Sequence, residues 1–261
     1  MPINPNTGQP VALFLFAHQD DECGVYHEIE KSVQQRHYVL CLYLTDGSYG
    51  GAAPEVRNRE SRRVLMKLGV PNENIYFPGS TLGIQDTRLC FSIPAATAAV
   101  AELLGSHPLA SLYCPAWEGG HPDHDALHVI VSLIIEQRGI RGNCWQYPLY
   151  HGAKMKHPFF RVLSPLAENG SSIAEIIPIR KRLAYLRYCA SYPSQIKTWI
   201  GLLPFFAWHY LTDGHQYLQP VRLFPNDVRP HAGPLYYEKR GFLTWKEFEN
   251  ATRHLSPTAR N

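Results

Sequence analysis

The alternation of short apolar runs with helix-like patterns is the feature that most limits the folds open to this chain. Continuous apolar runs occupy residues 11–17, 37–44 and 110–114, and such runs are typical of strands buried on both faces. Amphipathic helical patterns follow at residues 22–35 and 123–138. Strands and helices that alternate at this spacing predict βαβ units with right-handed crossovers and a parallel sheet.

Weaker elements extend the same pattern. A helix is predicted from Pro54 to Leu68, and an alanine-rich helix is predicted over residues 94–104. Shorter strands are expected at residues 74–77 and 144–147. We therefore expect an α/β chain with a Rossmann-like three-layer fold. It has a mainly parallel sheet, helices on both faces and a loop-rich aromatic C-terminal extension.

Composition excludes several classes of protein. The chain has 261 residues, of which 45% are hydrophobic and 18% charged, so it is expected to be globular with one core. A net charge of +3 without a Lys/Arg tract argues against nucleic-acid binding. The six cysteines show no CxxC pairing. No segment resembles a signal peptide or reaches transmembrane length, so we expect a cytoplasmic protein without a membrane segment.

Polar motifs follow two of the predicted strands. Residues 17–22 are AHQDDE and residues 121–124 are HPDH, and Asp46 follows the strand that lies between them in sequence. The carboxyl ends of parallel strands meet at one edge of a sheet, where α/β proteins usually bind ligands. The sequence therefore predicts three imidazoles and three motif aspartates at a common edge, a set that suits a catalytic divalent metal.

The chemistry of such a metal requires the side chains of each motif to divide their roles. Asp20 and Asp21 are adjacent and point in different directions, so one can bind metal while the other accepts a proton from water. His121 and His124 flank Asp123, so one imidazole can bind metal while the other faces the developing oxyanion. The spacing alone leaves both assignments open.

Simpler or different interpretations also exist for these residues. Asp20 and Asp123 lie where N-caps of the following helices are expected, which would be a purely structural reason for an acid. His18-x-Asp20 with a distant histidine also fits the facial triad of non-haem Fe(II) oxygenases, although a βα turn is an unusual setting for that triad. A Rossmann dehydrogenase is excluded, because no GxGxxG follows the first strand.

The two motifs resemble the paired signatures of the LmbE/PIG-L family of zinc-dependent deacetylases. Further similarities occur in order along the chain: Thr45-Asp46-Gly47, Arg57-x-x-Glu60, Leu68-Gly69-Val70, Asp86 within QDTRL, Lys181-x-x-Ala184 and Tyr192-Pro193-Ser194-Gln195. The resemblance covers residues 11–195, and residues 196–261 match no family motif. It implies a deacetylase domain over residues 1–195 and a C-terminal extension packed on the same domain.

The resemblance also implies roles that the spacing leaves open. The family's enzymes act on N-acetylated sugars and related amides, which implies a small-molecule sugar substrate. The implied zinc ligands are His18, Asp21 and His124. The implied general base is Asp20, with His121 as oxyanion stabiliser or acid and Asp123 supporting it. Arg57 and Asp86 are implied contacts to substrate hydroxyls. Zn²⁺ is the implied metal, with Fe²⁺ or Co²⁺ as other candidates, and a homo-oligomer is compatible with the resemblance.

Two departures from the family pattern bear on substrate and turn geometry. Gln19 stands where the family usually has proline, so the turn lacks that backbone constraint. Residues 196–261 are rich in aromatic side chains, for which packing of a C-terminal subdomain is favoured over stacking on a sugar. Prolines such as Pro204 and Pro220 predict long loops there. A non-catalytic sugar-binding protein on the same scaffold is the alternative function.

Overall fold

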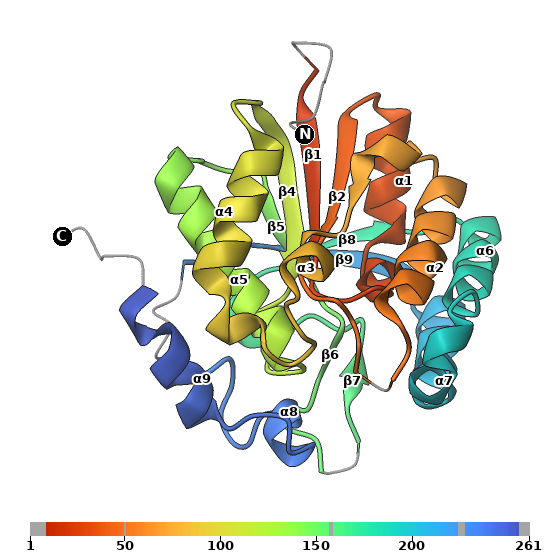
Figure 1. The fold of residues 1–261 in the computed structure, drawn as a ribbon. Helices are drawn as coiled ribbons and strands as arrows, with labels where there is room; N and C mark the ends of the chain where they lie inside the picture. Colours follow the sequence, from red (N-terminus) through yellow and green to blue (C-terminus); the bar gives the residue numbers. More distant parts are fainter. Residues whose placement is uncertain (1–8, 50, 157–158, 224–227, 256–261) are drawn as a thin grey trace.

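The computed structural model describes residues 9–49, 51–156, 159–223 and 228–255 (Figure 1). Its strands are β1 (Val11–Phe16), β2 (Tyr38–Tyr43), β3 (Ile75–Tyr76), β4 (Leu109–Pro115), β5 (Cys144–Tyr147), β6 (Tyr150–His151), β7 (Arg161–Val162), β8 (Ile173–Ile176) and β9 (His215–Pro220). Seven of them form one sheet in the order β3-β2-β1-β4-β5-β9-β8. The first five are parallel, and β9 is antiparallel to both β5 and β8.

Helices cover both faces of this sheet, which confirms the predicted three-layer α/β fold. The helices are α1 (Tyr26–Gln34), α2 (Pro54–Lys67), α3 (Pro78–Leu82), α4 (Ile93–Leu104), α5 (Pro122–Arg138), α6 (Ile179–Cys189), α7 (Ile196–Thr212), α8 (Tyr236–Lys239) and α9 (Trp245–Thr252). Among the described residues, no helix is both long enough and apolar enough to span a bilayer.

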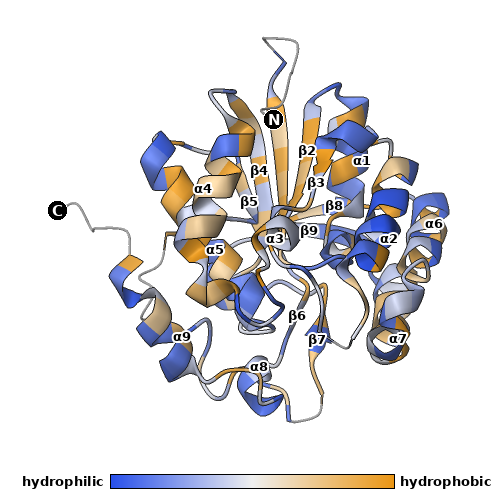
Figure 2. Ribbon diagram, in the orientation of Figure 1, coloured by the Kyte–Doolittle hydropathy of each residue, from blue (hydrophilic) through white to orange (hydrophobic). Residues whose placement is uncertain are grey.

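Alternation along β1 determines which core each side chain enters. Leu13 and Leu15 point to a core that includes residues of α4, α5 and α9. Phe14 and Phe16 point to the opposite core, which includes residues of α1, α2, α6 and α7. Every residue of β1 is buried, as expected for a central strand covered by helices on both sides. In Figure 2 the central strands carry the most continuous apolar colour.

The predicted elements of the first 150 residues match the structure within a few positions. The predicted strand at residues 144–147 coincides with β5, and the run at 110–114 lies inside β4. The helical pattern at residues 22–35 divides into the 3-10 turn η1 (Asp21–Gly24) and α1. This turn keeps Asp21 close to the end of β1.

The expectation that prolines break regular structure near the C-terminus is wrong at Pro204. α7 continues from Ile196 to Thr212 with Pro204 inside it. A proline inside a helix removes one backbone hydrogen bond and usually kinks the helix. The helix is held because its inner face, with Trp199, Phe206 and Tyr210, packs into the core. Tertiary packing therefore outweighs the local cost of the proline.

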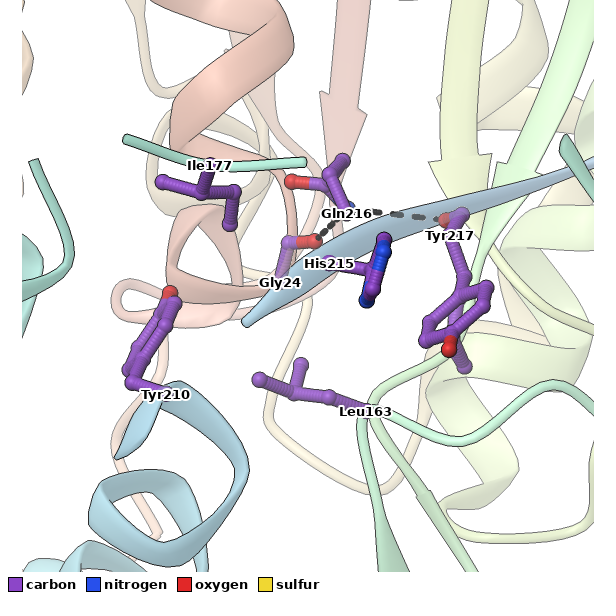
Figure 3. A pocket seen from close by; sticks show the side chains of 8 residues that line it. Gly24, Leu163, Ile177, Tyr210, His215, Gln216 and Tyr217 are labelled. Carbon is purple, nitrogen blue, oxygen red and sulfur yellow. Dashed lines mark hydrogen bonds between the residues drawn. The ribbon is translucent and has the colours of Figure 1, made fainter. Parts of the chain in front are cut away.

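Strand β9, from the region that matches no family motif, is bound to the turn that follows β1. The side-chain amide of Gln216 donates to the carbonyl of Gly24, the last residue of η1, at 2.7 Å (Figure 3). A Cβ on Gly24 would lie 2.6 Å from the Leu149 side chain and 2.8 Å from the Tyr147 ring, so any other residue here would force these side chains to move. The small cavity in Figure 3 lies between these segments.

Candidate metal centre

The two polar motifs meet at the carboxyl ends of β1 and β4, as predicted. His18 follows β1, and the HPDH motif opens α5 after β4. Nε2 of His18 lies 3.0 Å from Oδ2 of Asp123, and Nε2 of His124 lies 3.0 Å from Oδ1 of Asp21. Side chains more than a hundred residues apart in sequence are therefore in direct contact.

His18, Asp21 and His124 form a compact donor set. Each offers one ligating atom, and the three atoms lie within 4.8 Å of one another. Besides its contact with His124, the Asp21 carboxylate accepts hydrogen bonds from the backbone N–H groups of Ala17 and His18, at 3.0 and 2.8 Å. These bonds fix the carboxylate at the start of η1. Two imidazoles and one carboxylate form a donor set found in catalytic zinc sites.

The charges of this set are stabilised mutually. Burial opposes ionisation of Asp21, but the imidazoles of His124 and His18 hold its pKa well below the usual value. Burial also opposes protonation of His18, yet the carboxylates of Asp86 and Asp21 raise its pKa well above the usual value. The site thus has the electrostatic character of a cation-binding pocket, because carboxylates surround a buried positive charge.

A second group of donors shares His18 with the first. It comprises His18, Asp86, His121 and Asp123, again with ligating atoms within 4.8 Å of one another. Nε2 of His18 lies 3.2 Å from Oδ1 of Asp86, and Nε2 of His121 lies 3.6 Å from the same oxygen. Asp86, from the loop before α4, therefore reaches the same edge of the sheet.

Asp123 is not the N-cap of α5, which corrects the structural interpretation of this acid. The N-cap is His121, whose Nδ1 accepts from the backbone N–H of Asp123 at 3.2 Å. The Asp123 carboxylate instead accepts from the backbone N–H groups of Thr87 and Leu89, at 2.6 and 2.9 Å, while also contacting His18. It thus joins His18 to the loop that carries Asp86.

Asp20 has a backbone conformation that non-glycine residues rarely adopt. Its φ is 129°, and its side chain makes no capping hydrogen bond to the helical turn that follows. The buried carboxylate of Glu22 holds this conformation by accepting from the Asp20 N–H at 3.0 Å, and the hydroxyl of Tyr192 donates to Glu22 at 2.7 Å. No local pattern in the sequence indicates that Glu22 and Tyr192 support Asp20 in this way.

Burial gives the Asp20 carboxyl an affinity for protons. Burial raises the pKa of Asp20 to about 7, with further contributions from the carboxylates of Asp21 and Glu22. The guanidinium of Arg57 opposes this rise, and its Nη2 lies 3.4 Å from Oδ1 of Asp20. Asp20 remains partly exposed toward the cavity described below.

Arg57, a predicted substrate contact, is buried and also bound to the surrounding loops. Its Nη2 donates to the carbonyl of Gln19 at 2.7 Å, and its Nη1 donates to the carbonyl of Gly47. Gly47 has φ of +64°, and a Cβ there would collide with the side chain of Gln19. The Nη1 atom also lies 3.8 Å from Oδ2 of Asp86. Arg57 thus connects the two loops that carry Asp20 and Asp86.

Gln19 is buried and hydrogen-bonded in the position where the family pattern has proline. Its side-chain amide donates to Oδ1 of Asn58 at 2.7 Å and to the carbonyl of Thr45 at 3.4 Å. Asn58 in turn donates to Oγ of Ser80 at 3.2 Å. The turn after β1 is therefore held by side-chain hydrogen bonds to α2.

A cavity of about 460 Å³ opens in front of these residues. Its wall near the titratable cluster is formed by His18, Asp20, Asp21, Arg57, Asp86 and His121. Its remaining wall is largely apolar and comes mostly from later parts of the chain. The aromatic residues that line it are Tyr49, Tyr150, Phe160, Trp199, Phe206, Tyr236 and Phe242.

The structure gives the neighbouring residues Tyr150 and His151 different roles. Nε2 of His151 lies 3.2 Å from the carbonyl of Ser164, and its Nδ1 accepts from the N–H of Ala153. Burial lowers the pKa of His151 to about 4, as expected for a structural histidine. Tyr150 lines the cavity instead, with its ring centroid 5.7 Å from that of His124.

Comparison with models of known protein families gives a match in the first half of the chain. The family model named PIG-L, described as GlcNAc-PI de-N-acetylase, matches residues 13–135. We call these residues, which make up just under half of the chain, the PIG-L region. The PIG-L region ends within α5, so it contains both motifs and every predicted site residue. No curated protein sequence matches the chain.

Solved structures of similar fold match the chain beyond the PIG-L region. The chain is similar to N,N'-diacetylchitobiose deacetylase from Pyrococcus horikoshii, with 18% identity, a TM-score of 0.58, and coverage of 85% of this chain and 86% of that one. The A40926 pseudoaglycone deacetylase Dbv21 has 16% identity and a TM-score of 0.59, covering 85% and 98% of the two chains. A conserved protein from Thermus thermophilus has 20% identity and a TM-score of 0.58, covering 82% and 94%. At these identities the likeness is one of fold.

Proposed function

We propose that the protein is a metal-dependent hydrolase that removes an acetyl or other acyl group from the amide nitrogen of an N-acetylated sugar or sugar conjugate. One observation carries the proposal: His18 and Asp21 line a large cavity together with Asp20, and His124 completes their donor set. The PIG-L match and the deacetylases among the structures of similar fold support the same reaction class.

The donor set fits zinc on chemical grounds. His18 and His124 present ring nitrogens toward the Asp21 carboxylate, and three protein donors leave a coordination position for substrate or water. A zinc ion held by these residues would acidify water and polarise the amide carbonyl. Fe²⁺ or Co²⁺ would accept the same donors. The contact of Asp123 with His18 would orient the imidazole and increase its basicity.

Asp20 and His121 supply the proton chemistry of the proposed reaction. Asp20 accepts a proton from the attacking water and returns it to the leaving amine as the C–N bond breaks. Because Nδ1 of His121 accepts from the backbone N–H of Asp123, a neutral imidazole carries its proton on Nε2. Burial and the neighbouring His18 lower the pKa of His121, so this neutral form is the expected one. Its Nε2–H then donates to the carbonyl oxygen as negative charge develops.

The C-terminal region contributes to the proposed substrate site. Trp199, Tyr236 and Phe242 line the cavity, and all belong to residues 196–261. The ring centroid of Phe242 lies 5.2 Å from that of His121. Aromatic faces of this kind can stack on sugar rings, while Arg57 and Asp86 offer a donor and an acceptor for hydroxyl groups. The extension is thus proposed to complete the site that the PIG-L region begins.

Metal analysis combined with a free-amine assay tests the proposal. The purified protein is expected to contain about one divalent metal per chain and to release amine from at least one N-acetylglucosamine-type substrate. Asp20→Asn should retain the metal and lose on the order of a hundredfold or more in turnover.

Two outcomes would contradict it in different ways. Full activity of Asp20→Asn would show that Asp20 is not the general base, but it would not contradict the proposed deacetylation. Sugar binding by the fully metal-loaded protein without amine release from any substrate would favour a non-catalytic binding protein.

A further inference from the structure

The outward face of α7 is apolar although it is exposed. Ile200, Trp208 and Leu211 are 70%, 71% and 61% exposed, and they recur at helical spacing together with Ile196 and Pro204. The inward face of α7 packs into the core, so this helix is apolar on nearly all sides. A surface helix of a globular protein normally presents polar side chains to water, so we expect this face to bind another molecule or surface.

Helix α6 continues the same surface. α6 and α7 pack side by side at one edge of the molecule (Figure 1), and Arg182 joins them by donating to the carbonyl of Tyr210 at 3.3 Å. On α6, Ile179 and Leu183 are exposed at helical spacing. We call the exposed side chains of the two helices the α6–α7 face. It comprises Ile179, Arg180, Leu183, Arg187, Ile196, Lys197, Ile200, Pro204, Trp208 and Leu211.

The charge on this face has a single sign. No Asp or Glu occurs between Glu175 and Asp213, whereas Arg180, Arg187 and Lys197 are exposed there. No carboxylate in the described parts of the chain forms an ion pair with these three cations. Exposed apolar side chains interspersed with unpaired cations are complementary to a surface that is apolar inside and anionic outside.

The face also borders the mouth of the cavity. Lys197, Trp199 and Phe206, from the same helix, line the cavity wall. Phe205 is partly exposed, and its ring centroid lies 5.0 Å from that of Phe160, another cavity residue. A surface bound to the α6–α7 face would therefore lie next to the cavity opening.

We propose that the α6–α7 face docks on an anionic lipid surface. Ile200, Trp208 and Leu211 would enter the headgroup–acyl boundary, and Arg180, Arg187 and Lys197 would contact anionic headgroups. A second copy of the chain is a poorer occupant, because an isologous contact would bring the same cations together without a carboxylate between them. The proposal is independent of the reaction at the metal centre.

Co-sedimentation with vesicles tests the proposal. The wild-type chain should bind vesicles of phosphatidylcholine with about 30% phosphatidylglycerol at least roughly tenfold more strongly than pure phosphatidylcholine vesicles, and high salt should reduce this binding. Emission of Trp208 should shift to shorter wavelength on binding. The double variant Ile200→Ser/Trp208→Ser should bind the anionic vesicles at least about tenfold more weakly.

A matched control variant distinguishes binding through the α6–α7 face from non-specific adsorption to lipid. Met66 and Phe91 are 52% and 51% exposed on other parts of the surface, so Met66→Ser/Phe91→Ser should leave vesicle binding unchanged. Thermal unfolding should show both double variants folded. The proposal is overturned if the wild type fails to bind anionic vesicles, or if both double variants bind equally well. It is also overturned if light scattering shows a dimer that Ile200→Ser/Trp208→Ser converts to monomer, because the face then binds a second copy.

Discussion

The Asp123 carboxylate connects the second motif of the candidate site to the first motif and to the loop that carries Asp86. It accepts hydrogen bonds from two backbone N–H groups of the loop that carries Asp86, and it contacts Nε2 of His18. Its own backbone N–H fixes the ring of His121. Asp123 therefore orients two imidazoles, that of His18 in the first motif and that of His121 in its own motif. The family resemblance implies that Asp123 supports His121. In the structure Asp123 contacts His18 as well as His121.

We predict that Asp123→Asn weakens metal binding by roughly tenfold to a hundredfold, because the amide carries no charge to hold the His18 imidazole. Asp125→Asn is the matched control. Only Oδ1 of Asp125 accepts hydrogen bonds, from the N–H groups of Glu118 and Gly119, and an asparagine oxygen can keep both. Competition with a chromogenic chelator measures both affinities. Equal affinities for the two variants would contradict the proposed orientation of His18 by Asp123.

At the scale of elements, the candidate metal centre is contacted by segments that lie outside the PIG-L region. β9 pairs with β5 and β8, and Gln216 of β9 binds the carbonyl that ends η1. α7 and the segment around Tyr236 form cavity walls. The edge of the sheet that bears the motifs is therefore completed by residues whose sequence shows no family motif.

Gln216→Ala is expected to affect both folding and metal binding, because it releases the turn that contains Asp21. Gln219→Ala, on the same strand, is the control. Gln219 also donates to backbone carbonyls, those of Leu166 and Gly170 at 2.9 and 2.7 Å, but it does not touch the motif turns. Each variant should lose about 1–3 kcal/mol of unfolding free energy, because buried carbonyls lose their donor.

Only Gln216→Ala should lower metal affinity, measured by chelator competition at a temperature where both variants are folded. If Gln219→Ala lowers metal affinity to the same extent, β9 affects the site only through general stability.

At the scale of the whole molecule, buried neutral histidines make stability depend on pH. His128 is buried in α5 near Trp117, and its Nε2 has no hydrogen-bond partner among the described residues. Burial lowers the pKa of His128 to about 4, below the value of about 6.5 expected in the unfolded chain. Between these two values the unfolded state binds more protons than the folded state. Stability from this residue is therefore complete above pH 6.5 and is lost as pH falls toward 4.

His128→Gln should therefore reduce the loss of unfolding free energy between pH 7 and pH 4, by up to on the order of 3 kcal/mol. Urea unfolding of wild type and variant at a series of pH values measures the difference, which isolates this residue from other titrating groups. Parallel pH profiles of the two proteins would show that His128 is protonated equally in both states.

Local patterns in the sequence are sufficient to predict the parallel part of the sheet and the edge at which the candidate site lies. Periodicity is a local property, so the buried runs at residues 11–17 and 110–114 and the helices after them are readable without tertiary contacts. The positions of His18 and the HPDH motif follow from this alternation, because parallel strands bring their carboxyl ends together.

The way in which the remaining segments meet at that edge depends on tertiary contacts. α7 continues through Pro204 because core packing outweighs a local penalty, and β9 joins the sheet from a region without family motifs. Tyr192, 170 residues along the chain, binds the Glu22 carboxylate that holds the unusual backbone of Asp20, and Tyr150 rather than His151 faces the cavity. These features depend on contacts between residues distant in sequence, and such contacts leave no local pattern because their energy exists only after the chain has folded.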